Sequence, residues 1–125
     1  CVIDNNISYV KGLALPENNL ISHSLLFNYL GQLSHLESID LSNSDSDVEG
    51  GNQISSGDLI EICSLSTILK QLSLSYLRIG GSIPSCIGET LLKTETLNLD
   101  NNFIFGSTPE SLCSLDNFKT LNLAN

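Results

Sequence analysis

The residue types that most often do chemistry in proteins are few in this chain and widely spaced. His23 and His35 are its only histidines, and neither belongs to an H-E-x-x-H motif or a comparable constellation. The segment Gly80–Pro84 approaches the G-x-S-x-G motif of serine hydrolases, but Pro84 replaces the last glycine. Nothing in the sequence holds two carboxylates at the separation that a glycosidase requires. We therefore expect neither enzymatic activity nor a cofactor.

An acidic, glycine-containing segment, residues 42–56, is the strongest candidate for metal binding. Residues Asp45 to Gly50 read D-x-D-x-E-G, which resembles the start of an EF-hand calcium loop with Glu at the fifth position. The match then fails, because position twelve is Ser56 instead of a bidentate Glu and no amphipathic helices flank the loop. We interpret the segment as a solvated acidic loop, of the kind that often carries binding specificity.

The charge balance excludes one class of partner. Fourteen acidic and five basic residues give a net charge of −9. The basic residues are scattered along the sequence at Lys11, Lys70, Arg78, Lys93 and Lys119. Phosphate binding requires clustered Lys and Arg, so we expect no nucleic-acid partner.

A phrase with leucine-like residues at positions 1, 4 and 6, and asparagine favoured at 9, recurs along the chain. It starts at Val10, Leu36, Leu69, Thr94 and Phe118, so the intervals are 26, 33, 25 and 24 residues. A pattern of this kind and period is the signature of leucine-rich repeats. The longer interval places extra residues within 42–53. We expect a single domain over residues 1–125, with about four full repeats and part of a fifth, belonging to a longer protein.

Side chains alternate between the two faces of an extended segment, so positions 4 and 6 face inward and position 5 faces out. Leu97 is therefore expected in the core and Asn98 on the surface. An asparagine at position 9 can bond backbone groups where the chain leaves the strand. Asn18 and Asn102 can do this, Ser44 only in part and Leu77 not at all, so the column of amides should be interrupted.

A second phrase follows the first in two of the repeats, as Gly81-Ser82-Ile83-Pro84 and Gly106-Ser107-Thr108-Pro109. Together the two phrases resemble the plant-specific class of leucine-rich repeats, over about residues 10–125. The resemblance implies an α/β fold, a right-handed leucine-rich repeat solenoid. Its parallel β-sheet would form the concave face, with irregular, 3-10 or short helical segments on the convex face. Cys1 resembles the last residue of the cysteine-paired cap that precedes the repeats in this family.

The remaining cysteines occur without a C-x-x-C pair, which argues against a zinc or dithiol redox site. Cys63 and Cys113 occupy similar places two turns apart, too far for a disulfide, whose Cα atoms lie within about 7 Å. We interpret the cysteines as buried thiols that act as small apolar side chains.

Residues beside the inward leucines should form the concave, ligand-binding face. Tyr76, flanked by polar residues, is the candidate anchor, because exposed aromatic residues carry much of the energy at interfaces. The predicted ligand-binding residues are Lys70, Gln71, Ser73, Ser75, Tyr76, Thr96, Asn98, Asp100 and Asn122. Asn6, in Asn6-Ile7-Ser8, is a candidate N-glycosylation site, and no metal ligand is expected.

The resemblance implies an extracellular recognition module that binds a peptide or protein ligand, as in plant disease-resistance and receptor-like proteins, and possible contact with a co-receptor. The location would be the apoplast-facing side of the plasma membrane, with any membrane attachment in other parts of the parent protein. Two alternatives remain open. One is inhibition of a secreted polygalacturonase through the concave face. The other is ice binding by an array of Thr96, Thr120, Asn98 and Asn122, which Ala14 and Asp40 would interrupt.

Overall fold

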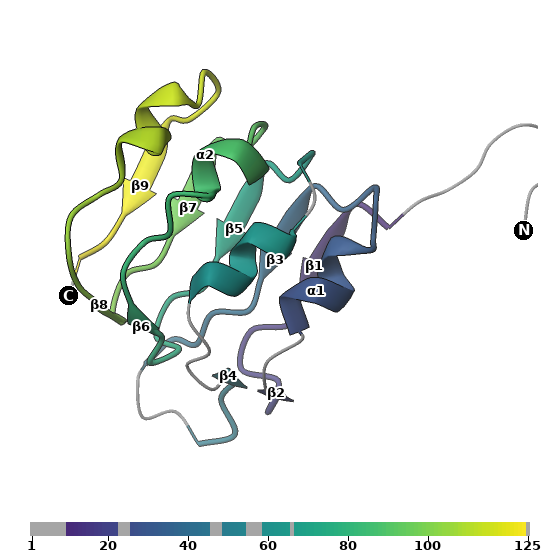
Figure 1. The fold of residues 1–125 in the computed structure, drawn as a ribbon. Helices are drawn as coiled ribbons and strands as arrows, with labels where there is room; N and C mark the ends of the chain where they lie inside the picture. Colours follow the sequence, from purple (N-terminus) through teal and green to yellow (C-terminus); the bar gives the residue numbers. More distant parts are fainter. Residues whose placement is uncertain (1–9, 23–25, 46–48, 55–58, 66, 125) are drawn as a thin grey trace, which may run out of the picture.

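The fold is α/β and is built around one parallel sheet (Figure 1). The computed structural model describes residues 10–124 except 23–25, 46–48, 55–58 and 66. Each occurrence of the repeated phrase contributes one strand, and the strands stand side by side in sequence order. They are β1 (Gly12–Ala14), β3 (Ser38–Asp40), β5 (Gln71–Ser73), β7 (Thr96–Asn98) and β9 (Thr120–Asn122).

The register of the sheet confirms the alignment of the repeats. Leu13 pairs with Ile39, and the same row continues through Leu72 and Leu97 to Leu121. These are the residues at position 4 of each phrase. Because a shift of one residue would turn every side chain to the opposite face, this shared register fixes which columns are inward and which are outward.

The inward residues form a continuous core, as the alternation predicts. In the central strands, Leu72 and Leu97 at position 4 and Leu74 and Leu99 at position 6 are at most 1% exposed. In the first and last strands the corresponding leucines are only partly buried. Thr94 takes the place of a leucine at position 1, is fully buried, and donates its hydroxyl hydrogen to the Leu69 carbonyl at 2.8 Å. Each turn thus depends on its neighbours for burial.

Short elements complete each turn after the main strand. Two small parallel sheets pair β2 (Ile21–Ser22) with β4 (Gln53–Ile54), and β6 (Gly80–Gly81) with β8 (Phe103–Ile104). The helices are α1 (Leu26–Gly31), the 3-10 helix η1 (Leu59–Ser64), α2 (Ile87–Thr90) and the 3-10 helix η2 (Glu110–Ser114). In Figure 1 they lie together over one face of the main sheet, as expected for the helical segments of this class.

The helices of neighbouring turns approach closely where a glycine occurs. A Cβ on Gly31 would stand 1.8 Å from the Ser64 carbonyl oxygen, and one on Gly88 would stand 2.4 Å from the Ser111 carbonyl oxygen. Any side chain at either position would collide with backbone of the next turn. These two glycines therefore set the packing distance between α1 and η1 and between α2 and η2.

A disulfide corrects the interpretation of the cysteines as buried thiols. Cys63 in η1 is bonded to Cys86, the residue before α2, with a Cα–Cα distance of 6.0 Å. The pair joins adjacent turns, whereas Cys63 and Cys113, which occupy similar places in their turns, are two turns apart. Cys113 is a free thiol and is exposed, not buried. The pairing could not be seen from the sequence, because Cys63 and Cys86 occupy different places in their turns and become neighbours only through stacking.

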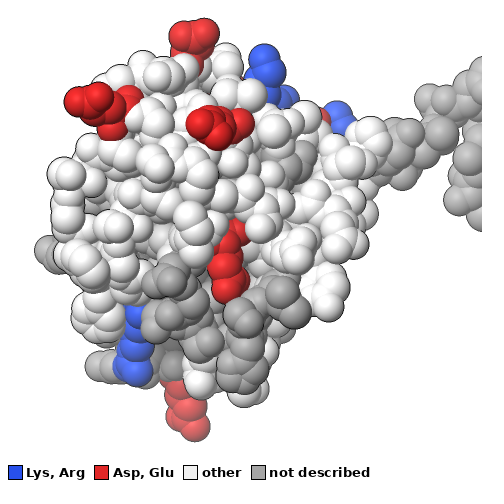
Figure 2. Space-filling model, viewed as in Figure 1, with Lys and Arg blue, Asp and Glu red and all other residues white. Residues whose placement is uncertain are grey.

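The described residues contain no helix long and apolar enough to cross a membrane. On the face shown in Figure 2, charged side chains stand apart from one another in a surface that is mostly uncharged. Several large apolar side chains are exposed, including Tyr29, Phe103 and Phe105, each about two-thirds accessible. Phe103 is the first residue of β8, and Phe105 directly follows that strand.

Candidate functional site

The face of the main sheet opposite the helices is lined by small and polar side chains. We call it the open face and define it by the residues at positions 3 and 5 of each phrase: Gly12, Ala14, Ser38, Asp40, Gln71, Ser73, Thr96, Asn98, Thr120 and Asn122. All are exposed or half-buried. Since neighbouring strands in a sheet are about 4.8 Å apart, the two columns present hydrogen-bonding groups at regular intervals.

A shallow depression of about 520 Å³ lies on this face. It extends across β1, β3, β5 and β7, and the residues that line it include Leu13, Ile39 and Leu72 in the middle of the first three of these strands. Gly12 and Ala14 line it on the β1 side, where short side chains leave the surface hollow. Ser38, Asp40, Gln71, Ser73, Thr96 and Asn98 supply its polar groups.

The structure brings together only part of the predicted ligand-binding set. Gln71, Ser73, Thr96 and Asn98 line the depression, and Asn122 lies on the same face in the last strand, β9. Lys70, Ser75, Tyr76 and Asp100 lie before or after their strands and do not line the depression. The depression instead includes Ser38 and Asp40, which sequence reasoning left out of the predicted set. Their places at positions 3 and 5 were the signal that could have included them.

Tyr76, the candidate anchor, lies outside the strand that carries Gln71 and Ser73, so it is not on the open face with them. β5 ends at Ser73, and Tyr76 lies in the turn beyond it with a left-handed backbone (φ 56°). Glu17 and Asn101, at the same position of their phrases, share this conformation (φ 50° and 53°). A repeated left-handed residue turns the chain away from the sheet, so the alternation of faces cannot be extended to position 8.

Side-chain hydrogen bonds join the polar columns across the strands. The hydroxyls of Ser42 and Ser73 are 2.8 Å apart, and Ser42 Oγ accepts the Ser75 amide at 3.1 Å. Asp40 Oδ1 accepts the Ser42 amide at 3.1 Å. Within the described part of the chain, the Asn98 side chain makes only long hydrogen bonds: it donates to Ser73 Oγ at 3.5 Å and accepts the Asp100 amide at 3.4 Å. The Asn98 side chain is therefore weakly held.

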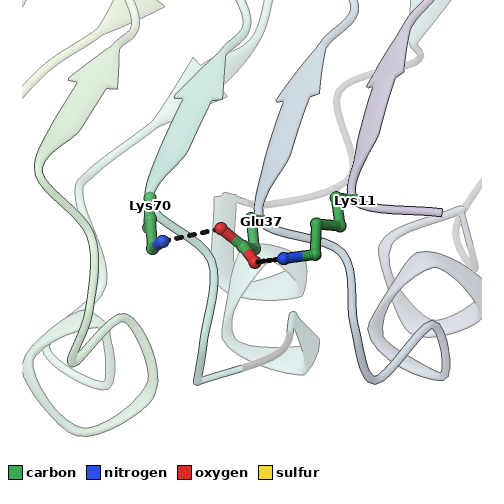
Figure 3. A network of polar contacts seen from close by, with 3 residues as sticks. All are labelled: Lys11, Glu37 and Lys70. Atoms are coloured by element: carbon green, nitrogen blue, oxygen red, sulfur yellow. Dashed lines mark hydrogen bonds and ion pairs between the residues drawn. The ribbon is translucent and has the colours of Figure 1, made fainter. Parts of the chain in front are cut away.

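Alternating charges run along the edge where the strands begin. Position 2 of the five phrases reads Lys11, Glu37, Lys70, Glu95 and Lys119. Glu37 is bonded by Lys70 at 2.6 Å and by Lys11 at 3.0 Å, as Figure 3 shows, and Lys119 bonds Glu95 at 2.7 Å. Three of the five basic residues, which are scattered in the sequence, are thus aligned along one edge and paired with carboxylates.

These pairs shift the titration of the groups involved. Hydrogen bonds from Lys70 and then Lys11 hold the pKa of Glu37 below its ordinary value. The bond to Glu37 raises the pKa of Lys70, and the bond from Lys119 lowers the pKa of Glu95. The lysines are largely exposed, so the row should contribute little to stability.

Buried asparagines tie the turns together at the opposite end of the strands. Asn102 accepts the amides of Leu77 and Ile79 and donates to the carbonyls of Leu74 and Leu99. This confirms the role predicted for Asn102. Leu77 has no side-chain amide to take this role, and its backbone N–H donates to Asn102 of the next turn. The prediction for Asn18 is wrong: its side chain is exposed, and its own backbone amide donates to Asn52.

Asn52, and not Ser44, fills this role in the turn with the acidic loop. Asn52 Oδ1 accepts the amides of Asn18 and Leu20, and its Nδ2 donates to the carbonyls of Leu15 and Leu41. Asn52 is 3% exposed. This matches the pattern of Asn102, so the residues that lengthen the turn are 44–51. Without them the 33-residue interval would be 25, equal to the next one.

Asn43 closes the base of the acidic loop. It donates to the carbonyls of Asn52 and Tyr76, at 3.1 and 3.0 Å, and accepts the Asn52 amide at 2.7 Å. At the loop surface, Glu17 Oε1 accepts the Ser44 amide at 2.7 Å. The described residues contain no group of three or more His, Cys, Asp or Glu side chains placed to hold a metal ion. Asp47, Ser56 and the candidate glycosylation site Asn6 lie outside the described residues.

The array considered for ice binding spans only two strands. Thr96 pairs with Thr120, and Asn98 pairs with Asn122. On the neighbouring strands the same columns hold Gln71 and Ser73, then Ser38 and Asp40. The open face is therefore mixed in side-chain size and charge, and it is hollowed by the depression.

Comparison with known proteins gives a partial match. No protein-family model matches the chain. Over 52 residues, 41% of this chain, the sequence is 48% identical to an Arabidopsis thaliana protein described as "Probable LRR receptor-like serine/threonine-protein kinase". The matched stretch is 7% of that kinase's length. The similarity to a receptor-like leucine-rich repeat protein is confined to that stretch.

Proposed function

We propose that this chain is an extracellular recognition module of a receptor-like leucine-rich repeat protein. In this proposal the stacked turns form part of a right-handed solenoid, and the open face is its concave, ligand-binding side. The ligand is a peptide or protein, and the chain itself catalyses no reaction. The likeness to a receptor-like kinase over 52 residues supports this class of protein.

The observation that carries the proposal is that the two faces of the sheet differ: one packs in the core, and the other presents polar groups with few partners. The inward residues of β3, β5 and β7 are almost fully buried and hold the turns in one register. The outward residues of the same strands make few and partly long hydrogen bonds. A rigid support with available donors and acceptors suits an extended ligand, whose own backbone groups need partners when water is excluded.

The composition of the open face favours a peptide over a polyanion. Its columns contain serine, threonine, asparagine and glutamine, and the lysines of the neighbouring edge are paired with glutamates. A phosphate-rich ligand would need unpaired cations along this face. The proposed location is outside the cell, where the Cys63–Cys86 disulfide would persist.

The test is selection of random peptides on the immobilised, disulfide-bonded chain, followed by affinity measurements on variants. Asn98→Arg places a bulky cation on the open face, and Glu89→Arg places the same side chain on the helical side at α2, where Glu89 is exposed. We expect at least a tenfold loss of affinity for Asn98→Arg and little change for Glu89→Arg. Selection of no peptides, or equal effects of both substitutions, would contradict the proposal.

A further inference from the structure

We propose that the depression on the open face is a subsite for a cationic side chain, with Asp40 as its counter-charge. The inference rests on the proposed function, because it names the part of a peptide ligand that this region would bind. It begins from the charges that line the depression. Among its described lining residues, Asp40 is the sole ionisable group.

The Asp40 carboxylate has bonding capacity that the fold does not use. Its Oδ1 accepts the Ser42 amide, and within the described part of the chain no group bonds Oδ2. Glu37, the other carboxylate near β3, is already paired with Lys11 and Lys70, the lysines that precede the two neighbouring strands. Asp40 is half-buried, so a cation placed against it would be partly shielded from water and the attraction would be stronger than on a bare surface.

The surroundings of Asp40 provide space on one side and acceptors on the other. Ala14 pairs with Asp40 in the neighbouring strand, and its methyl group leaves the depression open toward β1. Ser73 pairs with Asp40 on the other side, followed by Asn98. A guanidinium or ammonium group has donors only, so it could bond the carboxylate and these hydroxyl and amide oxygens together.

Other ligand groups fit the depression less well. Among the described residues, no aromatic side chain lines it, so a sugar ring would find no stacking surface there. The described part of the lining also contains no Lys or Arg, so a carboxylate or phosphate would meet the negative charge of Asp40 with no cation to pair with. The charge of Asp40 and the hydroxyl and amide groups beside it together favour the end of an arginine or lysine side chain.

The first experiment is an NMR titration of the isotope-labelled chain with methylguanidinium chloride, with sodium acetate as the matched salt. We expect saturable shifts at the amides of Ala14, Asp40 and Ser73 with methylguanidinium and none with acetate. Asp40→Asn should abolish them. Glu89→Gln is the control and should leave the shifts unchanged, because Glu89 is exposed on α2, on the helical side of the sheet and outside the depression.

The second experiment uses the peptides selected for the proposed function. Replacing one arginine or lysine by glutamine should weaken binding to the wild-type chain about tenfold or more, as expected for a hydrogen bond to a charged group, and leave binding to Asp40→Asn unchanged. In the NMR titration, an absence of methylguanidinium-induced shifts in the wild-type chain, or identical shifts in Asp40→Asn, would overturn the inference.

The two proposals fail in different ways. Peptides that bind the open face of the wild-type and Asp40→Asn chains equally well would overturn the subsite and leave the proposed function standing. A saturable methylguanidinium site at Asp40 in a chain that selects no peptides would overturn the proposed function and leave the cation site standing.

Discussion

The turns that begin at Leu36 and at Thr94 make the same hydrogen bonds to their neighbouring turns, although the first turn contains more residues. In the second of these turns Asn101 and Asn102 are adjacent, whereas in the first Asn43 and Asn52 are separated by eight residues. The backbone pattern on either side is preserved. The amides of Asn43 and Asn101 each bond the carbonyl of the following turn, from Ser75 and Ala124. Asn52 and Asn102 each bond the turn before.

This difference shows where the fold tolerates an insertion. The main strand has ended, and the next buried side chain that bonds the neighbouring turn is the asparagine, Asn52 or Asn102. In the shorter turn the left-handed Asn101 leads directly to Asn102, whereas Asn43 in the longer turn is not left-handed and the inserted residues follow it. In the longer turn, the Asn43 side chain bonds both backbone groups of Asn52. That contact fixes the ends of the loop, so the loop can vary without disturbing the stacked strands.

The largest effect should come from removing either buried asparagine. Asn52→Ala and Asn102→Ala each leave several backbone groups without a partner, and each should lower the free energy of unfolding by about 3–5 kcal/mol. Chemical denaturation of the two variants measures this. If Asn52→Ala costs less than half as much as Asn102→Ala, the two asparagines are not equivalent and the comparison fails.

Loss of the disulfide should have the next largest effect. It joins the turn with the insertion to its neighbour, whereas the Gly88–Ser111 contact between the following turns has no covalent link. Replacing both Cys63 and Cys86 by alanine should cost about 3 kcal/mol, mainly by freeing the unfolded chain. Cys113→Ala is the control and should change the free energy of unfolding by less than about 0.5 kcal/mol, since Cys113 is exposed.

Deleting residues 44–51 should have a smaller effect. It would join Asn43 directly to Asn52, which requires Asn43 to take the left-handed conformation of Asn101, one that asparagine tolerates. The deletion would remove the hydrogen bonds between Asn43 and Asn52, but it would also remove the entropy cost of closing the loop. The free energy of unfolding should therefore change by less than about 2 kcal/mol. Failure of the deleted chain to fold cooperatively would show that the loop is part of the fold.

The smallest effect concerns the charged row. Because the pKa of Glu37 is lowered in the folded chain, its contribution to stability is present above the ordinary value of 4.5 and is lost as the pH falls through the lower folded value. Glu37→Gln should remove this part of the acid dependence and reduce the effect of salt. The measurement is the unfolding midpoint from pH 3 to 7; identical profiles for wild-type and Glu37→Gln would contradict it.

The sequence predicted the repeating part of the molecule because that part depends on local alternation and period. The register of the five strands, the burial of Leu97 and the bonds of Asn102 all follow from the spacing of leucine and asparagine. Tyr76 was placed wrongly because alternation holds only while the backbone is extended. The left-handed residue that ends the strand is not marked by glycine here, so the sequence gives little warning of it.

Contacts between turns were the other part that the sequence did not reveal. Three features depend on which residues stacking places side by side: the Cys63–Cys86 disulfide, the charged row from Lys11 to Lys119, and the role of Asn52 at the position where Ser44 stands in the sequence pattern. The row of charges could have been read from position 2 once the phrases were aligned. The disulfide could not, because its two cysteines occupy unlike positions.

The most direct test of the account is to measure both the stability and the peptide affinity of Asn98→Ala. The account assigns stability to the inward column and recognition to the outward one. It predicts that the free energy of unfolding changes by less than about 0.5 kcal/mol, whereas Leu97→Ala, one residue away, costs about 2–5 kcal/mol. It also predicts that the affinity of Asn98→Ala for a selected peptide falls by more than about fivefold, about 1 kcal/mol. A stability loss close to that of Leu97→Ala, together with unchanged affinity, would contradict it.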